Sequence, residues 1–534
     1  MIASYLRFSA ALIVAVPLAT AAPIQARTGS STVARPPAAL PMAPAAIDDT
    51  VARAMKAFHV PGMAVGIVKD GRLVFARGYG VRDVGRAGKV DVDTLFQIGS
   101  NTKSVTAAAL SILVDEGKLR WDDRVIDLLP DFRMYDPYVT REFTVRDLLT
   151  HRSGLGEGAG DLMFFPATDM TRAEIVHGLR YLKPTSSFRS KYNYDNLLYM
   201  VAGQLIPAVT GQSWEDFVTS RILVPLHMSG CSPRYDLIAD RSNVAAPHVV
   251  IDGLVRAVPV VDMRSIGPAG TINCNVSGMA RWLETQLARG VEPGGQRLFS
   301  ADRSAEMWDV TTPTPLTQLQ SGLYGSHFAG YGFGWEVSDT RGYRLIHHNG
   351  GVLGTVTWVS MIPELGLGVV VLTNQQSGAA MEAVGGQILD AYLGGEKRDW
   401  VAIAQAIMAK RDANAASVND TVARTLASAG PPALPLSAYV GTYRDPWRGD
   451  AVVRRIGDTL VLKFSRTDSL EGNLIPYQGN IFVVRWKDRS LDADAFVRFE
   501  QGFDGKAADM TLRAISPSTD FSFDFQDLAF KRAD

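Results

Sequence analysis

"FQIGSNTKSVTAAAL", from Phe96 to Leu110, joins a short strand to an apolar helix and places a serine and a lysine three residues apart at the junction. Leu95 to Ile98 is strand-like, and Gly99 precedes Ser100. Apolar residues fill most faces of Ser104 to Glu116, which predicts a buried helix that ends at Gly117. Lys103 lies at the entrance of this helix and therefore needs a partner or a cleft.

Two predicted β-hairpins lie on either side of this stretch, far apart in the chain. Their strands are Met63 to Val68 with Leu73 to Gly80, and Thr355 to Ile362 with Leu367 to Thr373. Between them, the helical period is strongest over Leu197 to Ile206 and Ser277 to Leu287. Strands at both ends with helices between them predict an α+β domain, in which both ends share one antiparallel sheet and helices pack on it.

The composition changes after Asn374. Ala379 to Ala427 is rich in alanine and favours helix, and Pro431-Pro432 follows it. Short strand patterns then recur, at Val452 to Ile456, Thr459 to Phe464, Ile481 to Trp486, Ala495 to Phe499 and Met510 to Ile515. This spacing predicts a small antiparallel barrel or sandwich. We expect a catalytic domain over 47–395, a helical linker over 396–435 and a β domain over 436–534.

The N-terminal residues have the pattern of an export signal. Arg7 precedes an apolar stretch that ends in Ala19-Thr20-Ala21, a small-x-small pattern suited to a signal peptidase. We predict a signal peptide over 1–21 and a flexible leader over 22–46, which is rich in Pro, Ala, Ser and Thr. The stretch is too short for a membrane anchor. The mature protein is expected in the periplasm or secreted, without stable membrane insertion.

Charge and cysteine content narrow the possible partners. The 54 Lys and Arg balance 55 Asp and Glu, with no basic run, so no nucleic-acid surface is expected. The two cysteines, Cys231 and Cys274, lack the spacing of zinc ligands, and we expect buried free thiols rather than a disulfide. No metal and no cofactor are expected. The sequence does not indicate an oligomeric state.

Ser100 and Lys103 together can perform nucleophilic chemistry. A serine hydroxyl is a poor nucleophile until its proton is removed. A lysine one helical turn along lies on the same face and can remove that proton if it is desolvated. The pattern alone is weak, because most such lysines are solvated surface residues.

Two further clusters could complete a site. "YNYDNLLYMVAG", from Tyr192, offers the phenol of Tyr194 as a proton carrier and the amide of Asn196 as a donor. The alternative is a loop that caps the next helix. "HHNGGVLG", from His347, brings His348, Gly350 and Gly351 before a strand, where a backbone N–H could bind an oxyanion. The alternative is a plain turn.

Taken together, these clusters resemble the three motifs of the penicillin-recognising serine enzymes: class C β-lactamases, DD-peptidases, and related esterases and D-amino-acid peptidases. The motifs are Ser100-x-x-Lys103, Tyr194-x-Asn196 and His348-x-Gly350, and "LLTHRSGL" from Leu148, "GPAGTI" from Gly267 and "YGFGW" from Tyr331 are similar to stretches of the class C-like branch. The resemblance implies a serine β-lactamase-like fold over about 47–374. The C-terminal strands resemble the lipocalin-like domain of some peptidases in this branch.

The resemblance also implies roles for the motif residues. Ser100 would be acylated, Lys103 would exchange its proton, and Tyr194 would act as the acid/base that activates the deacylating water. Asn196 and His348 would hold the substrate. The N–H groups of Ser100 and Gly351 would bind the oxyanion.

One departure from the family pattern concerns the substrate. The β-lactamases carry lysine at the position of His348, and Asn349 replaces the usual Thr or Ser. Efficient β-lactam hydrolysis is therefore not expected, and the resemblance points to the esterases and peptidases of the branch. Because the lipocalin-like companion resembles that of the peptidases, we expect an exported serine hydrolase that acts on short linear peptides or on peptides with D- or unusual residues. Peptidases that trim linearised cyclic peptides such as microcystins are one possible relative. An esterase of the same family is the alternative, and a non-catalytic penicillin-binding sensor or structural protein is the alternative from another class.

Overall fold

The computed structural model of the chain describes residues 40–394 and 396–534. The predicted signal peptide, residues 1–21, lies outside this part, as does most of the predicted leader. The leader was predicted to extend to residue 46, and this bound is wrong because helix α1 (Pro44–Ala57) already begins at Pro44. Proline fits the first turn of a helix, where its missing N–H is not needed. No helix in the described residues is long and apolar enough to span a membrane.

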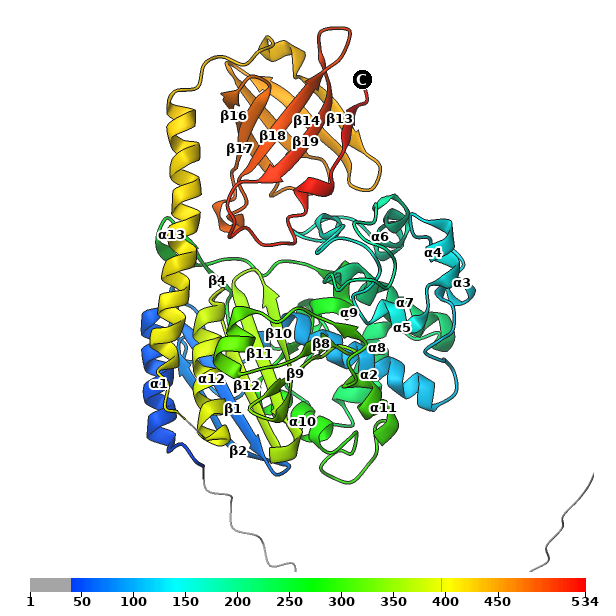
Figure 1. Ribbon diagram of the computed structural model, residues 1–534, viewed down its shortest axis with the longest axis vertical. Coiled ribbons are helices and arrows are strands. Elements are labelled where there is room, and N and C mark those ends of the chain that lie inside the picture. Colours follow the sequence, from blue (N-terminus) through cyan, green and yellow to red (C-terminus); the bar gives the residue numbers. More distant parts are fainter. Residues whose placement is uncertain (1–39, 395) are drawn as a thin grey trace, which may run out of the picture. The chain divides into compact units, whose positions relative to one another are not determined.

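An antiparallel sheet forms the centre of the larger domain (Figure 1). In residues 40–394 it has eight strands in the order β2-β1-β12-β11-β10-β9-β8-β7. In chain order they are β1 (Gly62–Lys69), β2 (Arg72–Gly80), β7 (Thr312–Pro313), β8 (Ala329–Tyr331), β9 (Glu336–Thr340), β10 (Tyr343–Val352), β11 (Thr355–Ile362) and β12 (Leu367–Thr373). The first strand pairs with the last, with Met63 opposite Thr373, so the prediction of a sheet shared by both ends of the domain is confirmed.

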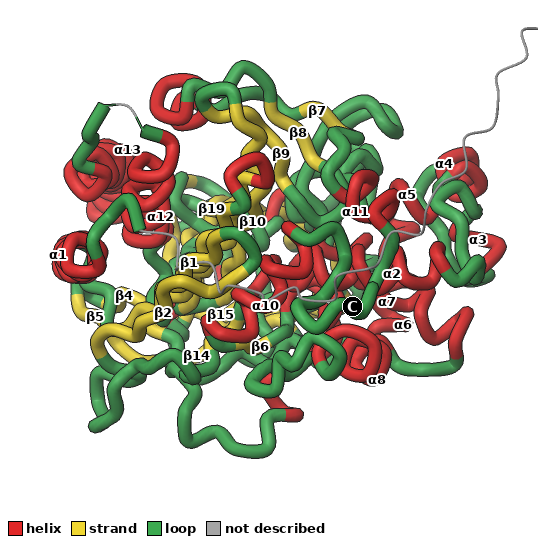
Figure 2. Tube along the Cα trace, turned by 90° about the horizontal axis from the view of Figure 1, so that it is seen from below, coloured by secondary structure: helices red, strands yellow, loops and turns green. Residues whose placement is uncertain are grey.

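Helices cover both faces of this sheet (Figure 2). Alternate residues of a strand point to opposite faces. Val369 and Val371 of β12 therefore pack with α1, α12 (Gly378–Leu393) and the start of α13 (Trp400–Ala427). Val370 and Leu372 pack on the other face, with α2 (Thr102–Asp115), α7 (Asn196–Thr210) and α10 (Val276–Leu287). Since both faces are covered, β1 and β12 are buried along almost their whole length.

Shorter elements fill the space around α2 and α7. The helices among them are α3 (Val125–Leu128), α4 (Pro137–Glu142), α5 (Val145–Leu148), α6 (Arg172–Gly178), α8 (Trp214–Val218), α9 (Gly267–Gly270) and α11 (Ala301–Met307). Two small sheets pair β3 (Phe96–Gln97) with β6 (Asn273–Cys274), and β4 (His248–Ile251) with β5 (Leu254–Ala257). The β3–β6 pair holds the chain directly before Gly99.

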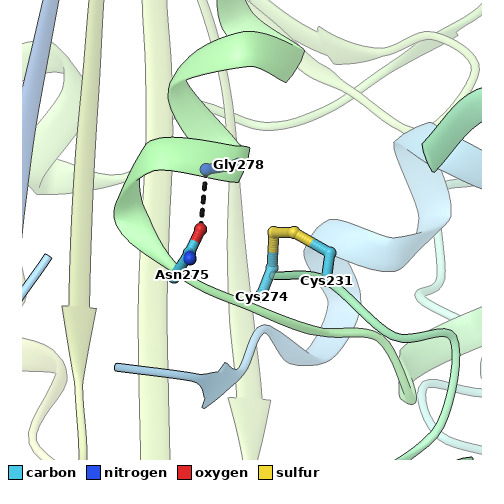
Figure 3. The surroundings of a disulfide bond; sticks show 4 residues. All are labelled: Cys231, Cys274, Asn275 and Gly278. Carbon is cyan, nitrogen blue, oxygen red and sulfur yellow. Dashed lines mark hydrogen bonds between the residues drawn. A yellow bond between two sulfur atoms is a disulfide. The ribbon is translucent and has the colours of Figure 1, made fainter. Parts of the chain in front are cut away.

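Cys231 and Cys274 form a disulfide, so the expectation of free thiols is wrong (Figure 3). The reason is a backbone bridge that the sequence spacing does not reveal: Ser232 and Asn273 each donate an N–H to the other's carbonyl, at 2.8 Å. This bridge brings the two neighbouring cysteines to a Cα–Cα distance of 4.1 Å. Gly278 leaves room for the sulfur atoms, because a Cβ there would lie 2.4 Å from the Cys231 sulfur. Disulfides are typical of exported proteins.

The C-terminal residues fold into a closed barrel of eight antiparallel strands, each paired with the next in the chain (Figure 1). Its strands are β13 (Gly441–Asp445), β14 (Gly449–Ile456), β15 (Thr459–Phe464), β16 (Glu471–Gln478), β17 (Ile481–Trp486), β18 (Ala495–Gln501), β19 (Ala507–Ala514) and β20 (Phe530–Arg532). Pairing of Tyr443 with Arg532 closes the ring, so no strand edge stays open. The predicted antiparallel β domain is thus confirmed as a barrel.

Aromatic side chains fill the interior of the barrel. Tyr439 and Phe482 meet edge to face, with ring centroids 4.9 Å apart, and Phe464 and Trp486 do so at 5.9 Å. Helix α13 contacts α12, α1 and strand β16, so it packs against both the sheet domain and the barrel.

Candidate active site

Ser100 lies in a short 3-10 turn, Gly99–Asn101, that leads directly into α2. Gly99 has a φ of 53°, a left-handed conformation that most side chains avoid. Ser100 is half-buried, and its side chain faces a pocket. The strand-to-helix junction that the sequence predicts thus presents the hydroxyl at the start of a buried helix.

Lys103 is fully buried one helical turn further on. Its ammonium group donates to the Ser100 hydroxyl at 2.9 Å, to Oδ1 of Asn196 at 2.7 Å and to the carbonyl of Ala269 at 3.0 Å. Burial lowers the pKa of Lys103 to about 7, against the opposing effect of the Asp161 and Asp195 carboxylates. A large share of Lys103 is therefore neutral near pH 7, as a general base requires.

The three contacts of Lys103 determine where its proton is exchanged. A neutral amine keeps two N–H donors and gains one lone pair, so one of the three contacts must reverse. The Ala269 carbonyl and Oδ1 of Asn196 can only accept, whereas the Ser100 hydroxyl can donate. The lone pair of neutral Lys103 therefore points at Ser100, and this is the geometry of a base next to its nucleophile.

Acylation of Ser100 is therefore expected to increase with pH and to level off above the pKa of Lys103. Because that pKa is about 7, the rate should fall about tenfold per pH unit well below it. The measurement is kcat/KM for a neutral p-nitrophenyl ester between pH 5 and pH 9, corrected for spontaneous hydrolysis. A profile that is flat across this range, or a rate that declines as the pH rises, would contradict Lys103 as the base.

Tyr194 lies beside this pair, with its ring centroid 4.7 Å from the Lys103 nitrogen. Burial raises the pKa of Tyr194 well above 10, although the Ser100 hydroxyl acts in the opposite direction. The phenol is therefore protonated at neutral pH. In this state Tyr194 can donate a proton to a leaving group, and Lys103 is left as the group that accepts the proton of Ser100.

His151, from the "LLTHRSGL" stretch, packs against the ring of Tyr194. The two ring centroids are 4.4 Å apart, and those of His151 and Tyr331 are 4.5 Å apart. Nδ1 of His151 accepts the backbone N–H of Asp195 at 3.1 Å, so a neutral ring carries its proton on Nε2. Burial lowers the pKa of His151 well below 6.5, and Lys103 contributes in the same direction. His151 is thus an uncharged packing partner for the phenol.

Two glycines let strand β10 touch the turn that carries Ser100. A Cβ on Gly350 would lie 1.9 Å from the Ile98 carbonyl, and a Cβ on Gly99 would lie 2.6 Å from the nitrogen of Gly351. Any side chain at either position would force the two segments apart. Gly351 itself faces open space on its Cβ side. Ser100 and Gly351, whose N–H groups the resemblance assigns to the oxyanion, thus line the same pocket on two segments in close contact.

His348 differs from the role that the resemblance implies. Its Nδ1 donates to the Asn349 carbonyl at 2.6 Å, and its Nε2 accepts from the Tyr331 hydroxyl at 3.0 Å. Burial lowers the pKa of His348 to about 3, and Lys103 adds to this effect. The ring is therefore neutral at working pH, and both of its nitrogens are already occupied. His348 shapes the pocket wall, but it has no free donor for a substrate carboxylate.

The pocket at Ser100 has a volume of about 350 Å³. Of the predicted site residues, Ser100, Tyr194, Asn196, His348 and Gly351 line it, whereas Lys103 and Gly350 lie behind the wall. Apolar side chains form one part of the wall: Phe164, Phe165, Met263, Ile266, Val352, Leu353 and Val356. Three acidic residues, Glu157, Glu336 and Asp520, contribute the charged groups, and none of the described residues that line the pocket is Lys or Arg.

Part of this pocket comes from the C-terminal barrel. Asp520, Phe521 and Ser522 line it, and the rings of Phe521 and Tyr194 meet edge to face with centroids 5.8 Å apart. Sequence reasoning missed this segment, and no local motif marks it. His151 and Tyr331 were noticed only as parts of flanking stretches. Both residues lie inside stretches that resemble the family, and this was the one signal in the sequence that could have pointed to them.

Comparison with known families agrees with this geometry. The model described as Beta-lactamase matches residues 47–393, more than half of the chain. The chain belongs to the beta-lactamase family. The resemblance seen in its motifs is thereby confirmed. A second model, described as Domain of unknown function (DUF3471), matches residues 427–532, which include the barrel.

Curated relatives include enzymes and a penicillin-binding protein. Unguisins hydrolase ungD' of Aspergillus campestris (strain IBT 28561) is 29% identical over 478 residues, which cover 86% of this chain and 87% of that protein. Penicillin-binding protein 4 of Amycolatopsis lactamdurans is 32% identical over 328 residues, covering 59% of this chain and 81% of its own length. With the family match, these relatives make the chain a hydrolase of the beta-lactamase-like serine hydrolase family.

Two solved structures have the same fold across both domains. The octameric penicillin-binding protein homologue from Pyrococcus abyssi aligns with a TM-score of 0.59 and 22% identity, over 91% of this chain and 99% of its own. SurE aligns with a TM-score of 0.53 and 20% identity, over 91% and 98%. At these identities the similarity concerns the fold alone.

Proposed function

We propose that this chain is a peptidase that acts through an acyl-enzyme on Ser100, with short linear peptides as its substrates. The observation that carries the chemistry is the 2.9 Å contact between the buried Lys103 nitrogen and the Ser100 hydroxyl at the pocket. In acylation, Lys103 takes the proton as the Ser100 oxygen bonds to the substrate carbonyl carbon. The N–H groups of Ser100 and Gly351 stabilise the oxyanion.

Tyr194 transfers a proton in both acylation and deacylation. As the C–N bond breaks, its phenol donates a proton to the leaving amine, and the phenolate stays beside the protonated Lys103. Water then attacks the acyl group and gives a proton back to Tyr194, and Ser100 leaves with the proton that Lys103 returns. Each group thus ends in its starting protonation state.

A free strand edge beside Ser100 supports a peptide substrate over a simple ester. The pairing of β10 with β9 stops at His347 opposite Glu336, whereas β10 continues to Val352. This stretch pairs with β11 on its other edge, and its residues Asn349 and Gly351 are exposed. An extended peptide can add to such an edge through backbone hydrogen bonds, which a small ester cannot provide.

The negative charge of the pocket wall favours substrates that carry no carboxylate near the scissile bond. Glu157, Glu336 and Asp520 carry the negative charges, and His348 is neutral. A carboxylate-bearing β-lactam would meet repulsion where a lysine of the lactamase pattern would attract it. A peptide whose residues inside the pocket are neutral or cationic would not meet this repulsion.

The test compares kcat/KM for nitrocefin, a neutral p-nitrophenyl ester and a peptide p-nitroanilide. We expect slow or undetectable nitrocefin hydrolysis, and a His348→Lys variant should raise the nitrocefin-to-ester ratio by about fivefold, the effect of an ion pair worth about 1 kcal/mol. His347→Lys is the matched control, because it adds the same charge outside the pocket lining. Wild-type nitrocefin hydrolysis near 10⁶ M⁻¹s⁻¹, on the order of a highly efficient enzyme, would overturn the proposal.

A further inference from the structure

A chain of hydrogen bonds connects the candidate base to the C-terminal barrel through a buried carboxyl group. Asp161 begins the 3-10 turn Asp161–Met163 and is fully buried. Its Oδ2 accepts the side-chain N–H of Asn196 at 2.8 Å and the hydroxyl of Ser522 at 2.8 Å. The other end of the Asn196 amide accepts from Lys103 at 2.7 Å. The chain therefore runs Lys103–Asn196–Asp161–Ser522.

Asp161 determines which end of the Asn196 amide faces Lys103. An amide has a donating NH₂ end and an accepting oxygen, and the carboxyl oxygen of Asp161 takes the NH₂ end. If the amide were reversed, its NH₂ would face the lysine nitrogen. Neutral Lys103 could then aim its lone pair at Asn196 instead of at Ser100. The orientation that Asp161 imposes is the one that leaves the lone pair for the nucleophile.

Residues of the barrel domain contact both the side chain of Asp161 and the backbone of its two neighbours. Besides the Ser522 contact, the buried carboxyl of Asp524 accepts the backbone N–H groups of Gly160 at 2.6 Å and Leu162 at 3.1 Å. These are the residues immediately before and after Asp161. The barrel segment 520–524 therefore fixes the turn, as well as the side chain, of the residue that orients Asn196.

Gly158 allows this close approach. A Cβ at this position would lie 2.8 Å from both the side chain and the carbonyl of Phe521. The backbone N–H of Gly158 also donates to the Tyr194 carbonyl at 2.8 Å. The loop before Asp161 thus contacts the barrel on one side and the segment of Tyr194 and Asn196 on the other.

We propose that Asp161 is a positioning residue for Lys103, acting through Asn196, and that the barrel segment 520–524 keeps Asp161 in place. The inference rests on the proposed acyl chemistry of Ser100 and Lys103. It gives the barrel a part in activating the nucleophile, beyond shaping the entrance for substrates. Burial raises the pKa of Asp161 well above 3.8, with Asp524 adding to the shift, and a protonated carboxyl still offers its carbonyl oxygen as the acceptor.

The first test compares Asp161→Ala with Asp161→Asn. The readout is the second-order rate at which a small fluorophosphonate labels Ser100, by forming a phosphonyl-serine with loss of fluoride, at about pH 9, where Lys103, with its pKa of about 7, is neutral. Asp161→Ala should be about 10- to 100-fold slower, because a misplaced catalytic group costs rates of this order. Asp161→Asn keeps an acceptor oxygen and should stay within about threefold of wild type.

The second test examines the contribution of the barrel domain with two serine variants that lie four residues apart, at Ser518 and Ser522. Ser522→Ala removes the donor to Asp161 and should slow the labelling of Ser100 about three- to tenfold, the effect of one net hydrogen bond. Ser518→Ala is the matched control, since Ser518 contacts Arg411 and lies outside the pocket lining. It should label at the wild-type rate. Thermal melting of all four variants shows whether a slow rate reflects loss of the folded state.

Three results would overturn the inference. The first is wild-type labelling of Asp161→Ala, and the second is an equal loss in Asp161→Asn and Asp161→Ala while Asp161→Asn melts like the wild type. The third is a Ser522→Ala rate that equals that of Ser518→Ala. If the wild-type protein itself is not labelled on Ser100, the proposed function fails, and the inference fails with it. A labelled wild type with unaffected variants would reject the inference alone.

Discussion

Ser100→Ala is expected to abolish substrate turnover and covalent labelling while the fold survives. The variant removes only the hydroxyl that attacks the carbonyl, and loss of a nucleophile lowers the rate by about 10⁴-fold or more. Ser100 is half-buried, and Lys103 keeps two other acceptors, Asn196 and the Ala269 carbonyl, when the hydroxyl is removed, so we expect the variant to fold. The measurement is mass spectrometry of the phosphonylated protein formed with a fluorophosphonate, together with kcat/KM for an activated ester.

Ser104→Ala is the control for this prediction. Ser104 lies on α2, directly after the turn of Ser100, but it donates to the Asn101 carbonyl and accepts from the Trp282 indole, away from the pocket. Its loss should lower the melting temperature and leave labelling intact. An adduct on any residue other than Ser100 would refute the assignment. If the activated ester acylates Ser100 and the acyl group is never released, the protein is a sensor instead of an enzyme.

Tyr194→Phe is expected to keep the packing of the site and to lose most of kcat. The phenylalanine ring retains the contacts with His151, Lys103 and Phe521, so only the proton carrier disappears. General acid catalysis is typically worth 10²- to 10⁴-fold, so we expect a loss of about 100-fold or more. The measurement is kcat and KM for the peptide p-nitroanilide, with circular dichroism to verify the fold.

Tyr192→Phe is the matched control, because Tyr192 also lines the pocket and belongs to the same segment. No hydrogen bond in the described residues joins its hydroxyl to Ser100 or Lys103. Its variant should therefore retain kcat within about threefold. If Tyr192→Phe suffers as much as Tyr194→Phe, the proton carrier has been assigned to the wrong tyrosine.

Much of the sheet domain and its motifs could be predicted, because local patterns determine them. The apolar residues after Lys103 require a buried helix, and α2 lies within two residues of the predicted ends. The second hairpin was predicted at its observed bounds, Thr355–Ile362 and Leu367–Thr373. β-branched runs on both sides of a proline- and glycine-bearing turn leave little alternative.

Contacts between distant residues could not be predicted from local patterns. The disulfide depends on the bridge between Ser232 and Asn273, and neither residue has any feature that marks it. The occupation of Nε2 of His348 depends on Tyr331, which lies on another strand, β8. Short polar strands were missed for a related reason: β16 contains Gly472, Asn473 and Pro476, which disfavour a strand in isolation.

The link between Asp161 and Ser522 has a consequence for the timing of activity during synthesis. The two residues are 361 positions apart in the chain. At translation rates of about 5 to 20 residues per second, the barrel segment is made roughly 20 to 70 seconds after the loop that it supports. During this interval Ser100 and Lys103 already exist in the nascent chain, but the group that orients the base has no support. On the proposed role of Asp161, full reactivity is therefore expected only after the barrel has been synthesised and has docked.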